Sequence, residues 1–430
     1  MKAHSFYPDQ KSTTLYAMAG DDLSLYFDLD NLTPKQLADH ISNIELTGLL
    51  QVANQYMGKP IDHVAMYEEF SREPWAEVLD FYRLCFQQMG ITQVDKKNLQ
   101  FHPHERFYES LSKTKPNIDL ITLYLLSGSN KVLHKNEKAL DISRAINSKM
   151  VFAKNAVKSG IPTPETIIFP KKEIDSKPVA EFLKHHKEVM LKIMGLGGAR
   201  NVISITSLEE AKNYLEEYDG NMEVLFQRKV STDTFTEMTV DLMISEKEIR
   251  IANVRKILFA EGLWVGNLIG SSVEITDEHK EILLKVGQYA REMGHVSQEG
   301  LNCGIDFFIS ADEILVTEIN ARWTGGLFPA EMQKRLNLGK KDVIAFFDTV
   351  SVESLPLYKK FLSKHLFPNF DAGFSNVPIG FSPFPITINS REQIFIWHMI
   401  VGDLDAFKAA KSKALPDFDM PTADVLSINL

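Results

Sequence analysis

The sequence contains little cysteine, no excess of positive charge and no long apolar run. Of its 430 residues, only Cys85 and Cys303 are cysteines, which is too few for a disulfide framework, and no Cys-x-x-Cys pair offers a zinc or redox site. The 47 Lys and Arg residues are outnumbered by 57 Asp and Glu residues, which gives a net charge of −10 and argues against nucleic acid or anionic lipid as a partner. No apolar run reaches the length of a membrane span, and the N-terminal residues lack an apolar signal region. We therefore expect a cytoplasmic protein.

The composition is that of a globular protein, with 44% hydrophobic and 24% charged residues. A chain of this length exceeds one ordinary hydrophobic core, so two or three domains are expected. Helical patterns beginning at Pro34 and at Trp75, the second ended by Gly90, alternate with short apolar runs such as residues 118–126. This alternation predicts the α/β fold class.

The most informative stretch runs from Gly304 to Arg322 and predicts a β-hairpin. Two arms rich in Ile, Val and Phe flank a short polar link. Alternate residues of a strand share a face, so Glu318, Asn320 and Arg322 should project together. If the link is 311–313, the register places Asp306 opposite Glu318.

Two carboxylates and an amide would then converge beside a guanidinium. Oxygen ligands of this kind suit Mg²⁺, or Mn²⁺ in its place, shared with phosphate oxygens. We take Asp306, Glu318 and Asn320 as the candidate metal ligands. The alternative is a hairpin that merely exposes acidic residues on its wet face.

A glycine-rich loop lies between two predicted strands. Lys192 ends the strand 189–193, and Gly195, Gly197 and Gly198 follow before β character resumes at Val202. A Walker or Rossmann loop would instead lead into a helix. The loop can close backbone N–H groups over a phosphate with Lys192 adding charge, or it can be an ordinary turn with a lysine that reaches water.

Further patterns surround this loop. Apolar spacing predicts one helix from Asp141 to Lys158, with Lys149 on its polar side. A strand ends in Phe226-Gln227-Arg228-Lys229-Val230, and Glu237 stands just before a predicted pair of strands.

Together, these ordered motifs resemble the ATP-grasp superfamily of ATP-dependent carboxylate–amine ligases over about residues 141–335. The resemblance implies an α+β ATP-grasp core that binds ATP and Mg²⁺. It implies Lys149 and Lys192 as phosphate-binding lysines, and Arg322 with Lys192 as catalytic cations. It also implies a nucleotide site formed by Lys149, Lys192, Gly195, Gly197, Gly198, Gln227, Arg228, Val230 and Glu237. Gln227 departs from the acid common at its position, which weakens the adenine assignment there.

The resemblance implies three regions: an α/β domain at 1–140, the ATP-grasp domain at 141–335, and an extension at 336–430 that packs on the ATP-grasp core. The stretch Asn320 to Pro329 also resembles a motif of the peptide ligase of pheganomycin biosynthesis. The residues that select the substrates are expected in 1–140 or in the Pro, Gly and Phe-rich stretch 367–385.

The implied reaction activates a carboxylate as an acyl phosphate and joins it to an amine. The substrates would be small acids and amines, such as amino acids or short peptides, without nucleic acid or membrane. Arg255 is a candidate clamp for the acid, because a guanidinium can bind a carboxylate through two hydrogen bonds. Two alternatives remain open: a kinase of the same fold acting on a non-carboxylate acceptor, and a nucleotide-binding regulator without turnover.

Overall fold

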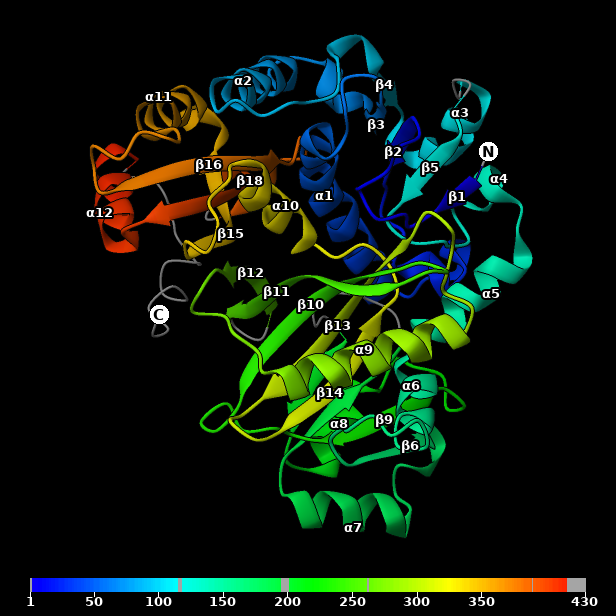
Figure 1. The fold of residues 1–430 in the computed structure, drawn as a ribbon. Helices are drawn as coiled ribbons and strands as arrows, with labels where there is room; N and C mark the ends of the chain where they lie inside the picture. The colour runs from blue at the N-terminus through cyan, green and yellow to red at the C-terminus, as the bar shows by residue number, and fades with distance from the viewer. Residues whose placement is uncertain (1, 115–117, 195–200, 261–262, 389, 416–430) are drawn as a thin grey trace.

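In the part of the chain that the structure describes, the strands form three β-sheets that are surrounded by helices (Figure 1). The computed structural model describes residues 2–114, 118–194, 201–260, 263–388 and 390–415. Within these residues, no helix is both long and apolar enough to cross a membrane.

The N-terminal sheet is parallel and has the strand order β1-β5-β2-β3-β4. The predicted helix starts are confirmed: Thr33 caps α1 in a reciprocal pair of hydrogen bonds with Gln36, and α2 begins at Trp75. Gly90 follows α2 with a φ of +74°, a conformation that favours glycine. The elements are β1 (Lys2–His4), β2 (Thr14–Ala17), α1 (Pro34–Met57), β3 (His63–Tyr67), α2 (Trp75–Gln88), β4 (Leu99–His102), α3 (Phe107–Thr114) and β5 (Leu120–Leu123).

The predicted helix from Asp141 to Lys158 is wrong, because the chain forms two helices there. After α4 (Lys131–His134), α5 (Glu137–Ile146) ends before Asn147, and α6 (Lys149–Asn155) starts afresh. The Ser148 side chain accepts a hydrogen bond from the backbone of Val151, so it caps α6. The break places Lys149 in the first turn of α6 rather than on the polar side of one long helix.

The second sheet is antiparallel, has the order β6-β9-β7-β8 and carries its own apolar core. The predicted hairpin around the glycine loop is confirmed by the pairing of β7 with β8. The elements are β6 (Thr166–Pro170), α7 (Lys177–His186), β7 (Val189–Lys192), β8 (Val202–Ile205), α8 (Leu208–Tyr214) and β9 (Glu223–Arg228).

The third sheet runs through the middle of the molecule in the order β14-β13-β10-β11-β12-β15-β18-β16, with β17 beside β18 (Figure 1). It continues across residue 335, because β12 pairs with β15. Its strands are β10 (Thr236–Ile244), β11 (Ile249–Ala260), β12 (Leu263–Ile269), β13 (Leu301–Ile309), β14 (Ile314–Asn320), β15 (Val343–Ser351), β16 (Phe374–Phe381), β17 (Ile386–Ile388) and β18 (Arg391–Gly402). The helices are α9 (Asp277–Glu292), α10 (Leu327–Arg335), α11 (Leu355–His365) and α12 (Leu404–Ala414).

Short 3₁₀ turns complete the described elements. They are η1 (Leu23–Leu25), η2 (Leu29–Asn31), η3 (Glu68–Ser71), η4 (Lys96–Asn98), η5 (His104–Arg106), η6 (Lys171–Glu173) and η7 (Val352–Ser354).

Candidate functional site

The hairpin of β13 and β14 brings the three candidate metal ligands together. Asp306 pairs directly with Glu318, as predicted, and Gly304 pairs with Asn320. The predicted symmetric register is wrong nearer the turn, where Ile309 pairs with Ile314, and a bulge next to Asp306 shifts the pairing by one residue and brings Asp306 opposite Glu318. Directly opposed residues have Cβ atoms about 5 Å apart. The Asn320 Nδ2 donates a hydrogen bond of 2.9 Å to Asp306 Oδ2.

The carboxylates of this site are crowded and shielded from water. Burial, followed by the charge of Glu318, raises the pKa of Asp306 to about 6. Burial, followed by the charge of Asp306, raises the pKa of Glu237 to about 7. A divalent cation would relieve this repulsion, and the hard oxygen donors fit Mg²⁺.

Two lysines reach the same site from different elements. Lys149, at the start of α6, places its Nζ 3.4 Å from Glu318 Oε2. Lys192, at the end of β7, is 7% exposed, and burial lowers its pKa to about 8. Both lysines line one cavity with Asp306 and Glu318.

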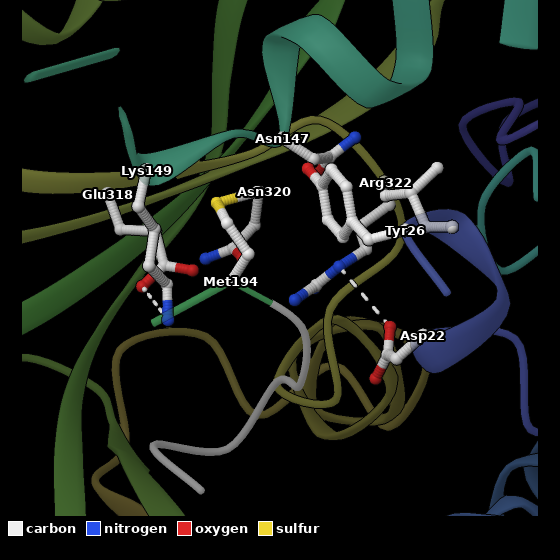
Figure 2. Close-up of a pocket in the computed structure, with 9 residues that line it drawn as sticks. Asp22, Tyr26, Asn147, Lys149, Met194, Glu318, Asn320 and Arg322 are labelled. Carbon is white, nitrogen blue, oxygen red and sulfur yellow. Dashed lines mark ion pairs between the residues drawn. The ribbon is translucent and has the colours of Figure 1, made fainter. Parts of the chain in front are cut away.

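Arg322 lies on the opposite flank of a small hollow of about 20 Å³ (Figure 2). Its Nε is 3.7 Å from Asp22 Oδ1, and its guanidinium lies 5.3 Å from the centre of the Tyr124 ring. Arg322 does not form an exposed salt bridge with Glu318: Glu318 pairs with Lys149, and the Arg322 side chain is only 11% exposed beside Asp22.

A cavity of about 510 Å³ extends from these charges to the C-terminal strands. Asp21 and Asp22, which follow β2, line it together with Tyr124, and sequence reasoning missed all three. One signal was present: polar residues a few positions after an apolar strand mark the edge where parallel α/β sheets bind ligands. No residue of the stretch 367–385 is among the described lining residues.

The predicted adenine-reading segment lies in the second sheet. Gln227 is buried on β9, and its Nε2 donates a hydrogen bond of 3.1 Å to Thr166 Oγ1. The Arg228 backbone N–H donates to Glu165, and Val230 is buried. These three residues are not among the described lining of the cavity. The predicted phosphate-covering residues Gly195, Gly197 and Gly198 lie outside the described residues.

Arg255 is fully buried beneath the middle of the cavity. It forms a close ion pair with Asp241, and its Nη2 donates a hydrogen bond of 3.3 Å to Thr324 Oγ1. One edge of the guanidinium is thus already occupied, while its Nε finds no hydrogen-bond partner among the described residues. Only this free edge could serve the predicted substrate clamp.

Comparison with known proteins gives matches in structure but not in sequence. No protein-family model and no curated protein matches the chain. N5-carboxyaminoimidazole synthetase of Staphylococcus aureus matches with a TM-score of 0.55 and 13% identity, covering 97% of this chain and 100% of that one. The N5-carboxyaminoimidazole synthase of Aspergillus clavatus, in complex with ADP and 5-aminoimidazole ribonucleotide, matches with a TM-score of 0.54 and 12% identity, covering 94% of this chain and 97% of that one. Phosphoribosylamine–glycine ligase of Thermotoga maritima matches with a TM-score of 0.53 and 13% identity, covering 94% of this chain and 97% of that one. The chain therefore has the ATP-grasp fold, in the multidomain arrangement of these synthetases and ligases.

Proposed function

We propose that the protein is an ATP- and Mg²⁺-dependent carboxylate–amine ligase. The observation that carries this proposal is the cross-strand pair of Asp306 and Glu318. Asn320 donates a hydrogen bond to Asp306, and the cationic side chains of Lys149, Lys192 and Arg322 line the same cavity. The fold matches ligases, and the carboxylate-rich site beside Lys149, Lys192 and Arg322 suits phosphoryl transfer, which depends on positioning and charge. The narrower resemblance to the pheganomycin peptide ligase stays a prediction.

In the proposed reaction, a carboxylate oxygen of the acid attacks the γ-phosphorus of ATP. The bond from that phosphorus to the ADP oxygen breaks, and an acyl phosphate forms. The amine nitrogen then attacks the acyl carbon, phosphate leaves, and the nitrogen loses a proton to give the amide. When bound, Mg²⁺ would offset phosphate charge between the nucleotide and the acid.

The residues of the chain have separate tasks in this reaction. Asp306, Glu318 and Asn320 would hold the metal. Lys192 would bind phosphate, because its buried ammonium has no ion-pair partner among the described residues. Arg322, oriented by Asp22, would meet the oxygens of the phosphoryl group in transfer.

The remaining assignments concern the nucleotide. Lys149 and Glu237, which belong to the charged cluster, would contact it, with Gln227, Arg228, Val230 and the glycines 195, 197 and 198 completing its site. The domain limits at 140 and 335 remain predictions.

The test is an activity screen of the purified protein with ATP, Mg²⁺ and pairs of amino acids, following phosphate release and product mass. Turnover that requires both an acid and an amine supports a ligase. Turnover with a single hydroxylated acceptor would assign a kinase, and tight ATP binding without turnover would assign a regulator.

A further inference from the structure

The far end of the cavity is built from aromatic side chains of the C-terminal strands. On β15, Phe347 is the one residue that is not fully buried, and on β18 Phe395 is partly exposed between buried neighbours. Both line the cavity, as does Trp264, whose ring centre lies 5.0 Å from that of Phe347. These exposed ring surfaces face the cavity because the other face of the sheet is packed.

The helix α1 supplies the opposite wall at this end. Leu46 and Leu50 are partly buried and line the same cavity, and Ile257 and Val265 continue the apolar surface from β11 and β12. Binding is favourable when an apolar group of a ligand displaces water from an apolar surface of this kind.

Strand register connects this apolar end to the charged end. Glu318 pairs with Asp306, Asp306 with Thr239, and Thr239 with Arg255, so these residues form one row across four strands. Neighbouring strands lie about 4.8 Å apart. Arg255 therefore stands about 10 Å from Asp306, between the charged end and the aromatic rings.

Two unsatisfied polar atoms mark the middle of this row. Arg255 Nε and Asn267 Oδ1 are buried and have no hydrogen-bond partner among the described residues. Gly326 lines the cavity beside them, and a Cβ there would come 2.4 Å from Arg255 Nε and 2.6 Å from Asn267 Oδ1. Glycine therefore keeps open a corner that holds one hydrogen-bond donor and one acceptor. Buried polar atoms of this kind need partners.

We infer that this end of the cavity binds a substrate with a large apolar side chain, in the form of an amino acid or a short peptide. The side chain lies among Trp264, Phe347 and Phe395. A carbonyl or carboxylate oxygen accepts from Arg255 Nε, and an N–H group donates to Asn267 Oδ1. This inference rests on the proposed ligase function and specifies its substrate class.

The test uses purified full-length protein, ATP and Mg²⁺, with a series of amino acids and dipeptides from glycine through alanine and leucine to phenylalanine. Phosphate release and product mass give kcat and KM for each substrate. We expect kcat/KM to rise at least 10-fold from alanine to phenylalanine or leucine. In Phe347→Ala, we expect the KM of the apolar substrate to rise about 10-fold while the KM for ATP stays unchanged.

Phe101→Ala is the matched control, because Phe101 is 39% exposed and is not among the described lining residues. Thermal unfolding of each variant separates loss of fold from loss of binding, and Phe395→Leu offers a milder change if Phe347→Ala unfolds. Asn267→Leu, which removes the acceptor oxygen, should weaken the binding of substrates that carry the N–H group without altering ATP affinity.

The outcomes separate the two proposals. Turnover confined to small polar or phosphorylated substrates, or an unchanged side-chain preference in folded Phe347→Ala, overturns the inference and leaves the ligase function standing. The inference is also overturned if the protein turns over ATP but accepts no amino acid or peptide of the series as a substrate. A protein that does not bind ATP overturns the proposed function itself.

Discussion

The two ends of the cavity are built in different ways. The charged end draws Asp306, Glu318, Asn320 and Arg322 from one hairpin, whereas the apolar end collects side chains from α1, β11, β12, β15 and β18. The charged end therefore depends on a local register, and the apolar end depends on a sheet that continues from the ATP-grasp strands into the C-terminal segment. Chemistry and specificity should be separable by mutation.

The largest effect is expected at the metal ligands. Glu318→Gln keeps the size of the side chain but removes a charge that faces Asp306 and Lys149, so Mg²⁺-dependent ATP binding should weaken and kcat should fall by about 10³-fold. Binding measured by calorimetry at several Mg²⁺ concentrations, together with turnover, checks this. ATP binding that keeps its Mg²⁺ dependence in this variant would move the metal site elsewhere.

Arg322→Ala should chiefly lower kcat, by about 10²-fold, with nucleotide Kd nearly unchanged. An interaction made mainly in the transition state leaves ground-state binding intact. Arg72→Ala is the control, because Arg72 is an exposed arginine paired with Glu68. Near-normal kcat in Arg322→Ala would remove the arginine from the mechanism.

Two buried lysines sharpen the comparison, since burial lowers the pKa of both Lys192 and Lys411 to about 8. Lys411 forms a close ion pair with Asp348, so Lys411→Met leaves a buried carboxylate and should cost about 3–5 kcal/mol of unfolding free energy. Lys192→Met should leave stability unchanged or higher and raise the Kd for ATP about 10-fold. Denaturant unfolding and ATP titration of both variants check this pair, and a stability loss in Lys192→Met equal to that of Lys411→Met would mark Lys192 as structural.

The smallest effect concerns pH. The folded pKa of Lys192 is lowered from 10.5 to about 8. Between about pH 8 and pH 10.5 the unfolded lysine still holds a proton that the folded lysine has lost. This residue therefore makes the free energy of unfolding rise with pH in that range. ATP attracts the charged form, so ATP affinity should fall several-fold as pH rises through 8. Calorimetric titrations of the wild type from pH 7 to 9.5 measure this, with Lys192→Met as the control that should lack the step; a flat wild-type profile would contradict the role of the ammonium.

The hairpin was predictable because its information is local. The β-rich arms and short polar link predicted the hairpin and the facing pair Asp306 and Glu318, but not the bulge that brings this pair together. The turn pairs Ile309 with Ile314, so an unbroken register would have set Asp306 opposite Thr317.

The break between the two helices at Asn147 and Ser148 was not predicted, because the apolar spacing continues across it. The Ser148 side chain accepts a hydrogen bond from the backbone of Val151 and so starts a new helix there instead of continuing the first. Arg255 and its partner Asp241 lie on the consecutive strands β10 and β11, so their proximity is local, but the burial of this ion pair was not predictable because Thr324, from a distant segment, hydrogen-bonds to both side chains.

The sequence by itself determined the class of fold and the chemical character of the charged end, because strand periodicity and residue type fix which side chains share a face. Only the tertiary structure decided the rest. It joined β12 to β15, set α1 opposite the sheet and exposed Phe347 and Phe395 to the same cavity as Glu318. These contacts connect residues far apart in the chain, and long-range packing leaves no periodic pattern in a single sequence.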